Sequence, residues 1–187
     1  MKRDECLRLL ARHIPEEIVV AVYTAAFDWA KIRPHRRNYF SVGAMGLASS
    51  HALGLALGLP DRRIVVLDGD GSLLMNLGSL VTIANAAPQN LIHFVCENGT
   101  YEANGAHPIP GRGKVSFAGL ARAAGYAQVY ELSTLEELER DIGAILGATG
   151  PVFVDLKLVP GEKVIPDYDA LYAASGREAF RAAIAEL

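Results

Sequence analysis

Two segments of this sequence carry side chains that could bind a metal. Asp70 stands in a Gly-Asp-Gly-Ser run at 69–72, and Asn98 opens an Asn-Gly turn 28 positions later (98 − 70). A carboxylate and an amide oxygen are hard ligands that suit Mg²⁺, which usually completes its shell with water and phosphate oxygens. Gly69 and Gly71 would let the backbone turn tightly and approach a ligand. The pattern predicts a site for a magnesium-bound diphosphate.

Alternating strands and helices must position these residues. Strands are predicted at 17–23, 38–42, 64–70, 91–97, 127–131 and 151–159. Helices are predicted at 2–13, 47–59, 72–86, 116–124, 133–146 and 170–186. This order predicts an α/β fold, a doubly wound and mostly parallel sheet with helices on both faces, in a single domain 1–187. Loops after neighbouring parallel strands meet at one edge, so Asp70 and Asn98 should lie close together.

Three local patterns add smaller expectations. Ser72 is placed to cap the helix that follows it, whose free N–H groups could bind an anion. Ser133 followed by Glu136 predicts a capping box at the start of another helix. The Gly- and Pro-rich segment 98–114 is a predicted long loop, and long ordered loops are often functional. The basic segment 31–37 is expected at the surface or at a subunit interface.

Composition excludes several classes of protein. The chain has 187 residues, 51% of them hydrophobic, which is enough for one full core. Its formal net charge of −3 gives no electrostatic basis for binding nucleic acid. No apolar run reaches membrane-spanning length, and the first residues do not resemble a signal peptide. Cys6 and Cys96 match no metal or redox spacing, so we expect reduced thiols in a cytoplasmic protein.

The GDG run with an Asn-containing loop about 25 residues later resembles the diphosphate-binding signature of thiamine diphosphate enzymes. The resemblance implies that Mg²⁺ is bound by Asp70, by Asn98 and by the backbone carbonyl of Thr100. The family usually has an Asn-Asn pair, and this chain has Glu97 at the first position of the pair. That position is not the usual metal ligand.

A second motif supports the resemblance. The Gly-Ala-Met-Gly run at 43–46 is similar to the family's segment that holds the cofactor in a bent shape. By that resemblance Met45 is the apolar wedge between the cofactor rings, and its N–H reaches the pyrimidine. The carbonyl of Gly43 would accept a hydrogen bond from the 4′-amino group, with Ala44 alongside.

Over nearly its full length the chain resembles the pyrophosphate-binding half of the sulfopyruvate and phosphonopyruvate decarboxylase type. The resemblance implies decarboxylation of an anionic 2-oxo acid with thiamine diphosphate and Mg²⁺. In the family, the glutamate that activates the cofactor belongs to a pyrimidine-binding domain, for which this chain has no room. We therefore expect a pyrimidine-binding α subunit of similar size, in an α₂β₂ or larger assembly.

The resemblance and the position of the loops give the remaining candidates. Met45 is also expected to take part in catalysis, together with polar residues of the long loop, namely Glu102, Asn104 and His107. The cofactor is expected to contact Thr24, Gly43, Ala44, Met45, Gly69, Asp70, Gly71, Ser72, Asn98, Thr100 and Tyr101. Arg112 and Lys114 are weaker candidates that could bind the distal anion of the substrate.

Other functions remain to be weighed against this one. The run 65–72 also imitates the haloacid dehalogenase phosphatase motif, with Asp68 as nucleophile and Asp70 as acid/base. A calcium loop fails because Leu73 and Ser79 stand where glycine and glutamate are required. No Gly-x-Gly-x-x-Gly run follows the first strand, which excludes the usual dinucleotide-binding site. A non-catalytic subunit that binds the cofactor is the last alternative.

Overall fold

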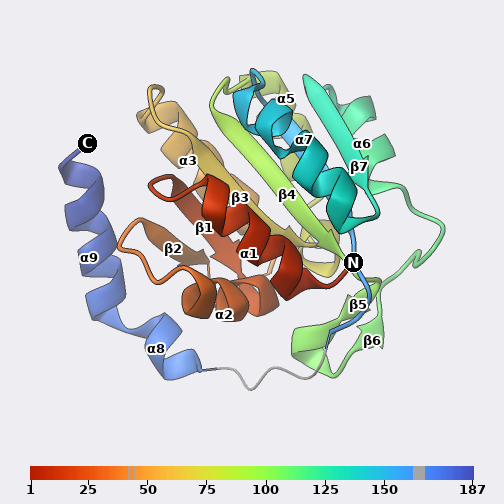
Figure 1. The fold of residues 1–187 in the computed structure, drawn as a ribbon, viewed down its shortest axis with the longest axis horizontal. Coiled ribbons are helices and arrows are strands. Elements are labelled where there is room, and N and C mark those ends of the chain that lie inside the picture. The colour runs from red at the N-terminus through yellow and green to blue at the C-terminus, as the bar shows by residue number, and fades with distance from the viewer. Residues whose placement is uncertain (42, 44, 162–166) are drawn as a thin grey trace.

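The computed structural model describes residues 1–41, 43, 45–161 and 167–187. Its centre is a six-stranded sheet in the order β2-β1-β3-β4-β8-β7, and every neighbouring pair is parallel (Figure 1). The strands are β1 (Ile18–Val22), β2 (Asn38–Ser41), β3 (Ile64–Gly69), β4 (Leu91–Glu97), β7 (Gln128–Leu132) and β8 (Val152–Lys157). A short antiparallel pair, β5 (Thr100–Tyr101) and β6 (His107–Pro108), stands apart from the sheet.

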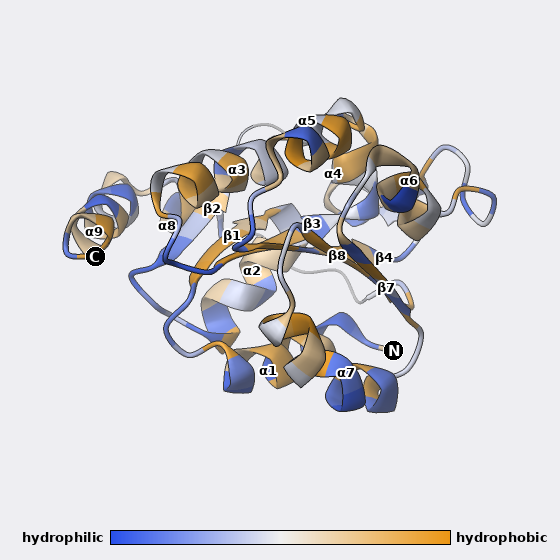
Figure 2. Cartoon of the chain, turned by 90° about the horizontal axis from the view of Figure 1, so that it is seen from above, coloured by the Kyte–Doolittle hydropathy of each residue, from blue (hydrophilic) through white to orange (hydrophobic). Residues whose placement is uncertain are grey.

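Helices cover both faces of this sheet (Figure 2). One face packs on α1 (Arg3–His13), α2 (Tyr23–Ile32) and α7 (Leu135–Gly147). The other face packs on α3 (Ala48–Gly58), α4 (Asp70–Leu74), α5 (Gly78–Ala86) and α6 (Phe117–Ala124). The chain ends in α8 (Tyr168–Tyr172) and α9 (Ala174–Ala185), and a 3₁₀ turn (Glu102–Asn104) joins β5 to β6. The predicted doubly wound α/β fold is confirmed.

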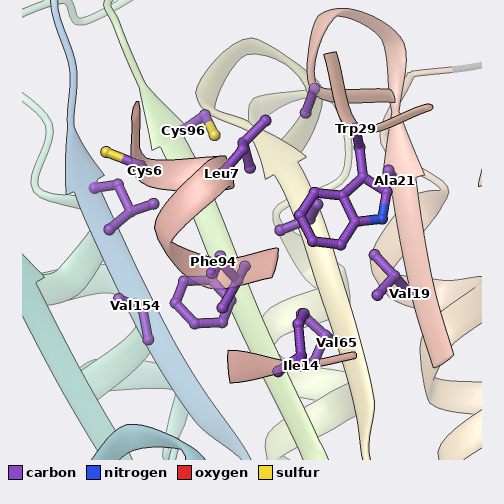
Figure 3. Close-up of a cluster of buried hydrophobic side chains, with 14 of the residues drawn as sticks. Cys6, Leu7, Ile14, Val19, Ala21, Trp29, Val65, Phe94, Cys96 and Val154 are labelled. Atoms are coloured by element: carbon purple, nitrogen blue, oxygen red, sulfur yellow. The ribbon is translucent and has the colours of Figure 1, made fainter. Parts of the chain in front are cut away.

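The central strands are apolar along their whole length because both of their faces are covered. In β1 every residue is buried, and β3 and β4 are buried up to their last position. Trp29 of α2 and Phe94 of β4 are the largest fully buried side chains of the cluster in Figure 3, which joins α1 and α2 to the sheet. Cys6 and Cys96 are free, buried thiols in the same cluster.

The structure corrects several predicted boundaries. The helix expected at 72–86 is two helices, α4 and α5, separated by a turn at 75–77. The helix expected at 170–186 is likewise divided into α8 and α9. A ten-residue helix, α2, follows β1 directly, and the helix ranges predicted above do not include it. The predicted loop at 98–114 contains the β5–β6 pair, because Thr100 and Tyr101 find strand partners within it.

The capping box lies one residue later than predicted. Thr134, and not Ser133, accepts a hydrogen bond from Glu137 N–H, and the Glu137 carboxylate accepts from the Thr134 N–H. Glu137 also accepts from the N–H of Ser133, so both candidate residues contribute donors to the same carboxylate. Sequence alone could not separate two adjacent hydroxyl residues that are each followed by a glutamate at the right distance.

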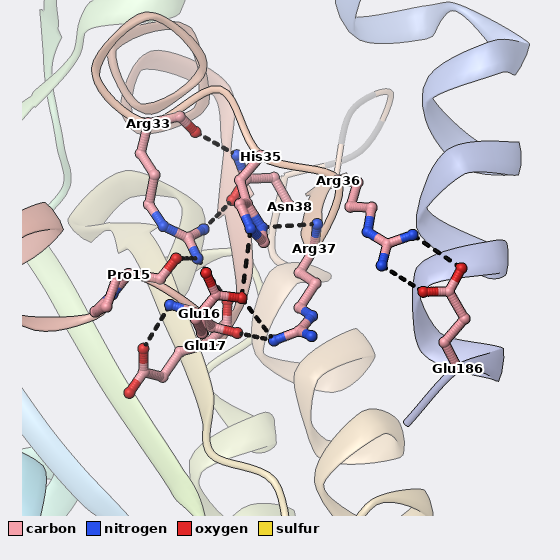
Figure 4. A network of polar contacts seen from close by, with 9 residues as sticks. All are labelled: Pro15, Glu16, Glu17, Arg33, His35, Arg36, Arg37, Asn38 and Glu186. Carbon is pink, nitrogen blue, oxygen red and sulfur yellow. Dashed lines mark hydrogen bonds and ion pairs between the residues drawn. The ribbon is translucent and has the colours of Figure 1, made fainter.

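The basic segment 31–37 precedes the edge strand β2 and has a mainly structural role there (Figure 4). Arg33 is buried and donates to the carbonyls of Pro15 and Glu17 and to the side-chain oxygen of Asn38. Arg36 forms an ion pair with Glu186, which follows α9 and ties this last helix to the sheet edge. Of the segment predicted to lie at the surface, Arg33 is therefore part of the interior.

Within the described ranges, none of the helices has both the length and the apolar character needed to span a bilayer.

Candidate functional site

A pocket opens at the carboxyl edge of the sheet, and we call it the strand-edge pocket. It lies between the ends of β1 and β3, which are neighbours although their connections run in opposite directions along the sheet. Open α/β sheets bind ligands at such a switch in strand order. Its empty volume is about 440 Å³, part of it open to solvent. It is lined by Arg3, Val22, Tyr23, Thr24, Ala25, Met45, Gly69, Asp70, Gly71, Ser72, Cys96, Asn98, Thr100, Tyr101, Glu102 and Ala103.

Asp70 lies at the floor of this pocket and is held by backbone N–H groups from two segments. Its Oδ1 accepts from the N–H of Gly71 at 2.7 Å, and its Oδ2 accepts from Asn98 and Gly99 at 3.0 and 2.6 Å. Burial raises the pKa of this carboxyl to about 6, although all three hydrogen bonds act in the opposite direction. A carboxylate has about four acceptor positions, so one remains for a metal.

Asn98 stands beside Asp70, as its spacing predicts. Its Oδ1 accepts from the Thr100 N–H at 2.8 Å and from the Thr100 hydroxyl at 3.0 Å. These bonds fix the side chain in one orientation, and rotation of the hydroxyl would free an acceptor position for a metal. Since Gly99 has a φ of +73° and donates to Asp70, the Asn-Gly turn is folded around the carboxylate.

The two glycines of the GDG run have different roles from those predicted. Neither has a positive φ, so the turn itself does not require glycine. A Cβ at Gly71 would stand 2.4 Å from Cε1 of Tyr101, so the Tyr101 ring occupies the space that glycine leaves open. A Cβ at Gly69 would meet no atom within 4 Å, which leaves the pocket accessible above it. We expected a ligand to approach Gly71 closely, and the side chain of Tyr101 occupies that position.

Asp68, the other aspartate of the motif, does not line the pocket. It is fully buried, its Oδ1 accepts from the Gly69 N–H at 2.9 Å, and its Oδ2 lies 3.3 Å from Nε2 of His93. His93 Nδ1 lies 3.2 Å from the Tyr126 hydroxyl. Because a nucleophile must reach its substrate, this closed chain of contacts argues against the phosphatase alternative.

A buried cation that the sequence did not single out forms part of the pocket wall. Arg3 of α1 donates to Asp28 of α2 at 2.7 Å and forms an ion pair with Glu102. The other oxygen of Glu102 accepts from the N–H of Gly161 at 2.6 Å. Glu102, a predicted catalytic residue, therefore lies in the pocket with both of its oxygens engaged.

Sequence reasoning also missed the residues that follow β1. Tyr23 has a φ of +44°, a conformation that is uncommon for a bulky residue and is often found at functional sites. It lies next to the predicted Thr24 at the pocket. Cys96 is the last apolar residue before the Asn98 turn, and burial raises the pKa of its thiol, so that it stays protonated. No sequence signal marked Arg3, Val22, Ala25 or Ala103.

Several predicted residues lie elsewhere. Asn104 and His107 are exposed on the β5–β6 segment and do not line the strand-edge pocket. Arg112 packs against Gly99, because a Cβ on Gly99 would stand 2.8 Å from Nε of Arg112. Arg112 lines a different depression. Lys114 is exposed. Gly43 is not among the residues that line the pocket, and a Cβ there would stand 3.7 Å from the hydroxyl of Tyr172. Ala44 falls outside the described residues.

The donor set fits Mg²⁺ bound together with a phosphorylated ligand. Among the described residues, no group of three or more His, Cys, Asp or Glu side chains could hold a metal. Asp70 and Asn98 supply two oxygen ligands, so further oxygens must come from the backbone, from water and from the ligand itself. A metal that depends on phosphate oxygens is the arrangement that Mg²⁺ prefers.

Comparison with known proteins defines the class. Residues 20–156 match the family model described as thiamine pyrophosphate enzyme, C-terminal TPP binding domain. The match covers most of the chain and includes the whole strand-edge pocket except Arg3. The chain belongs to this family, and the predicted resemblance is confirmed.

Curated relatives narrow the likeness further. The chain is 40% identical over 161 residues to a phosphonopyruvate decarboxylase of Streptomyces viridochromogenes, with 85% of this chain and 40% of that protein covered. It thus spans about two fifths of that relative's length. It is also 33% identical to the sulfopyruvate decarboxylase subunit beta of Methanothermobacter thermautotrophicus, over 90% of this chain and 88% of the relative.

Solved structures agree on the fold. The benzoylformate decarboxylase from Polynucleobacter necessarius superimposes with a TM-score of 0.73, over 89% of this chain and 34% of that one. A putative thiamin diphosphate-dependent enzyme from Mycobacterium smegmatis gives 0.71. At 22% identity in both cases, these matches establish the architecture.

Proposed function

We propose that residues 1–187 form the pyrophosphate-binding subunit of a 2-oxo acid decarboxylase that depends on thiamine diphosphate and Mg²⁺. The observation that carries the proposal is the strand-edge pocket, where Asp70, Asn98 and Thr100 meet Met45. These residues come from three separate segments of the chain. Membership of the TPP-binding family supports the assignment of the cofactor.

Each residue has a defined task in this proposal. Asp70 and Asn98, with the Thr100 carbonyl, hold the Mg²⁺ that neutralises the diphosphate. Ser72 and Gly69 also line the pocket, as does Thr24, which follows β1. Met45 supplies the apolar surface for the ring end, since its flexible thioether side chain adapts well to an irregular crevice.

When bound, thiamine diphosphate supplies a carbon nucleophile that attacks the 2-oxo group and accepts the electrons released with CO₂. The chain's own contribution is orientation and exclusion of water. Tyr101 packs against the GDG turn, and Arg3 with Glu102 forms the wall beside it. Where these side chains exclude water, electrostatic contacts within the pocket are stronger.

A second subunit completes the site in our proposal. The acidic side chains lining the pocket in the described part of the chain are Asp70 and Glu102, and both are already engaged. Neither is free to act on the cofactor's pyrimidine ring. We therefore assign that task to a pyrimidine-binding α subunit in an α₂β₂ or larger assembly. The name subunit beta of the Methanothermobacter relative supports such a partner.

The substrate is proposed to be an anionic pyruvate derivative, sulfopyruvate or phosphonopyruvate. The names of the relatives support this class, with 40% identity to a phosphonopyruvate decarboxylase and 33% to a sulfopyruvate decarboxylase subunit. Arg112 and Lys114 stay candidates for the distal anion, although they lie outside the pocket. Asn104 and His107 stay candidates for contacts to the reacting carbon from the same exposed segment.

The test is a calorimetric titration of the chain with thiamine diphosphate, with and without Mg²⁺, alone and with its partner subunit. We expect Mg²⁺-dependent binding, and we expect Asp70→Ala to remove the Mg²⁺-dependent part. The chain alone should not decarboxylate either substrate. Robust turnover by the isolated chain would contradict the shared site, and full cofactor binding with no turnover in any assembly would favour a non-catalytic subunit.

A further inference from the structure

Two hydrogen bonds hold the backbone of Gly46, and we call this pair the Gly46 clamp. The Gly46 N–H donates to Ser72 Oγ at 2.9 Å, and the Gly46 carbonyl accepts from Nδ2 of Asn76 at 2.9 Å. Both polar groups of one peptide residue are therefore satisfied by side chains from the segment that follows β3. The clamp joins the turn that carries Met45 to the turn that carries Asp70.

The backbone of Gly46 lies very close to the segment 72–76. Gly46 has a φ of +86°, in the left-handed region that favours glycine. A Cβ at this position would stand 3.0 Å from Cβ of Asn76 and 3.3 Å from the Ser72 carbonyl oxygen. A side chain here would have a strained φ and would require its neighbours to move by a few tenths of an ångström, so glycine fits this approach best.

The break between α4 and α5 presents Asn76 to Gly46. Around the turn at 75–77 the backbone makes short-range bonds: Met75 N–H donates to the Ser72 carbonyl at 3.1 Å, and Asn76 N–H donates to the Leu73 carbonyl at 3.0 Å. In a regular α-helix continuing from α4, the side chain of residue 76 would point in a different direction around the helix axis. The interruption thus places the amide of Asn76 at the Gly46 carbonyl.

A third bond supports the same junction farther along. Ser49 of α3 donates to the hydroxyl of Ser79 of α5 at 3.0 Å, and both side chains are buried. The segment 46–49 is therefore fixed to the segment 72–79 at both ends. Met45 and Ser72 both line the strand-edge pocket, so this junction connects two parts of its wall.

We propose that Asn76 is a positioning residue that, through Gly46, fixes the Met45 turn relative to the Asp70 turn and so selects the length and bend of the bound cofactor. The inference rests on the proposed function. It separates two parts of binding: the Asp70 turn holds the diphosphate end without Asn76, and the ring end depends on the clamp. One neutral hydrogen bond contributes about 1 kcal/mol net, which corresponds to roughly a fivefold to tenfold change in affinity.

The experiment compares two ligands on the same variants by calorimetry in the presence of Mg²⁺. Thiamine diphosphate needs both turns, whereas inorganic pyrophosphate needs only the Asp70 turn. We expect Asn76→Ala to weaken thiamine diphosphate about fivefold to tenfold and to change pyrophosphate binding by less than about twofold. Asn85→Ala, the same change at an exposed position of α5, is the matched control and should alter neither. Measurements are made on the full chain and on its assembly with the partner.

A second measurement reports on the turn directly. The chain has three methionines, so methyl-labelled methionine gives a simple NMR spectrum in which Met45 can be assigned by substitution. Asn76→Ala should shift or broaden the Met45 methyl signal and leave that of Met1 unchanged, while the far-UV circular dichroism stays that of the wild type. Asn76→Asp, which keeps the shape and loses the donor, should act like Asn76→Ala.

The outcomes distinguish the inference from the proposed function. If the wild-type chain binds neither ligand in either state, the proposed function fails. If it binds thiamine diphosphate and Asn76→Ala binds it equally well, only the positioning role is overturned. Equal weakening of both ligands would also overturn it, because it would show general damage to the Asp70 turn.

Discussion

Two aspartates, two positions apart in one motif, serve different parts of this molecule. Both are almost completely buried, with Asp68 at 0% and Asp70 at 2% exposure. Asp68 faces the layer of α5 and α6 and meets an imidazole, whereas Asp70 faces the strand-edge pocket and meets three backbone N–H groups. Burial alone does not distinguish a structural carboxylate from one that binds a ligand. The partners do.

The two carboxylates differ in access: Asp70 lines the strand-edge pocket and Asp68 does not. The two oxygens of Asp68 are matched to the Gly69 N–H and to His93, inside a layer that also contains Tyr126 and Phe153. Asp70 is held by one backbone N–H group of α4 and two of the loop after β4, and it faces the pocket. A buried carboxylate held by backbone donors is pre-organised for a cation, because the protein has already fixed its orientation.

The largest expected effect tests the pocket side of this comparison. Asp70→Ala removes the charged ligand from the metal, and we expect the Mg²⁺-dependent affinity for thiamine diphosphate to fall by about 1000-fold, or about 4 kcal/mol. The three backbone N–H groups that donate to Asp70 lose their acceptor, so the far-UV circular dichroism of the variant is first compared with that of the wild type. Calorimetry with and without Mg²⁺ measures the loss, and an unchanged Mg²⁺ dependence would show that the metal is bound elsewhere.

The second prediction concerns the structural aspartate. Asp68→Ala leaves a buried imidazole and a buried N–H group without their acceptor, and we expect the free energy of unfolding to fall by about 3 kcal/mol. Asp68→Asn keeps the shape and an acceptor for Gly69, so its cost should be about 1 kcal/mol. Urea denaturation gives both values. A larger loss for Asn than for Ala would contradict the assigned contacts.

The third prediction follows from the raised pKa of Asp70, about 6, which burial causes in the metal-free chain. The pKa in the folded state exceeds the unfolded value, so this group stabilises the fold fully below pH 4, and the contribution is lost as the pH rises to about 6. Binding of Mg²⁺ has the opposite dependence, because it needs the carboxylate. Affinity should fall about tenfold per unit below pH 6.

The control for this pH dependence is Asp70→Asn, which cannot titrate. Its unfolding free energy should lack the part of the wild-type change between pH 4 and pH 6. If the variant and the wild type show the same profile, another group is responsible and Asp70 is not the titrating residue.

The smallest effect belongs to the far end of the Asp68 contacts. Tyr126→Phe removes the hydroxyl that lies 3.2 Å from His93 and keeps the ring that packs against Phe153. We expect a loss of about 1 kcal/mol in unfolding free energy and no change in Mg²⁺-dependent cofactor affinity. A large effect on affinity would mean that the two aspartates are coupled through Gly69. That result would contradict the separate structural and ligand-binding roles of Asp68 and Asp70.

The sequence by itself determined the parts of this protein that depend on periodicity and spacing. Continuous apolar segments predicted strands of a parallel sheet because such strands are covered on both faces. The spacing from Asp70 to Asn98 predicted two loops at one edge, since it equals one helix and one strand. The Met45 turn was recognised from its flanking glycines, and the structure places Met45 in the same pocket.

Only the tertiary structure decided how the side chains of those segments are shared among neighbours. That Tyr101 fills the space above Gly71, and that Arg112 lies against Gly99 outside the pocket, depends on how the segment 98–114 folds back on the sheet. The bond of Asn76 to the Gly46 carbonyl, thirty residues earlier in the chain, likewise depends on how the two segments pack. Local sequence encodes which residues can turn, pair or coordinate, but the choice of partner depends on packing between distant segments.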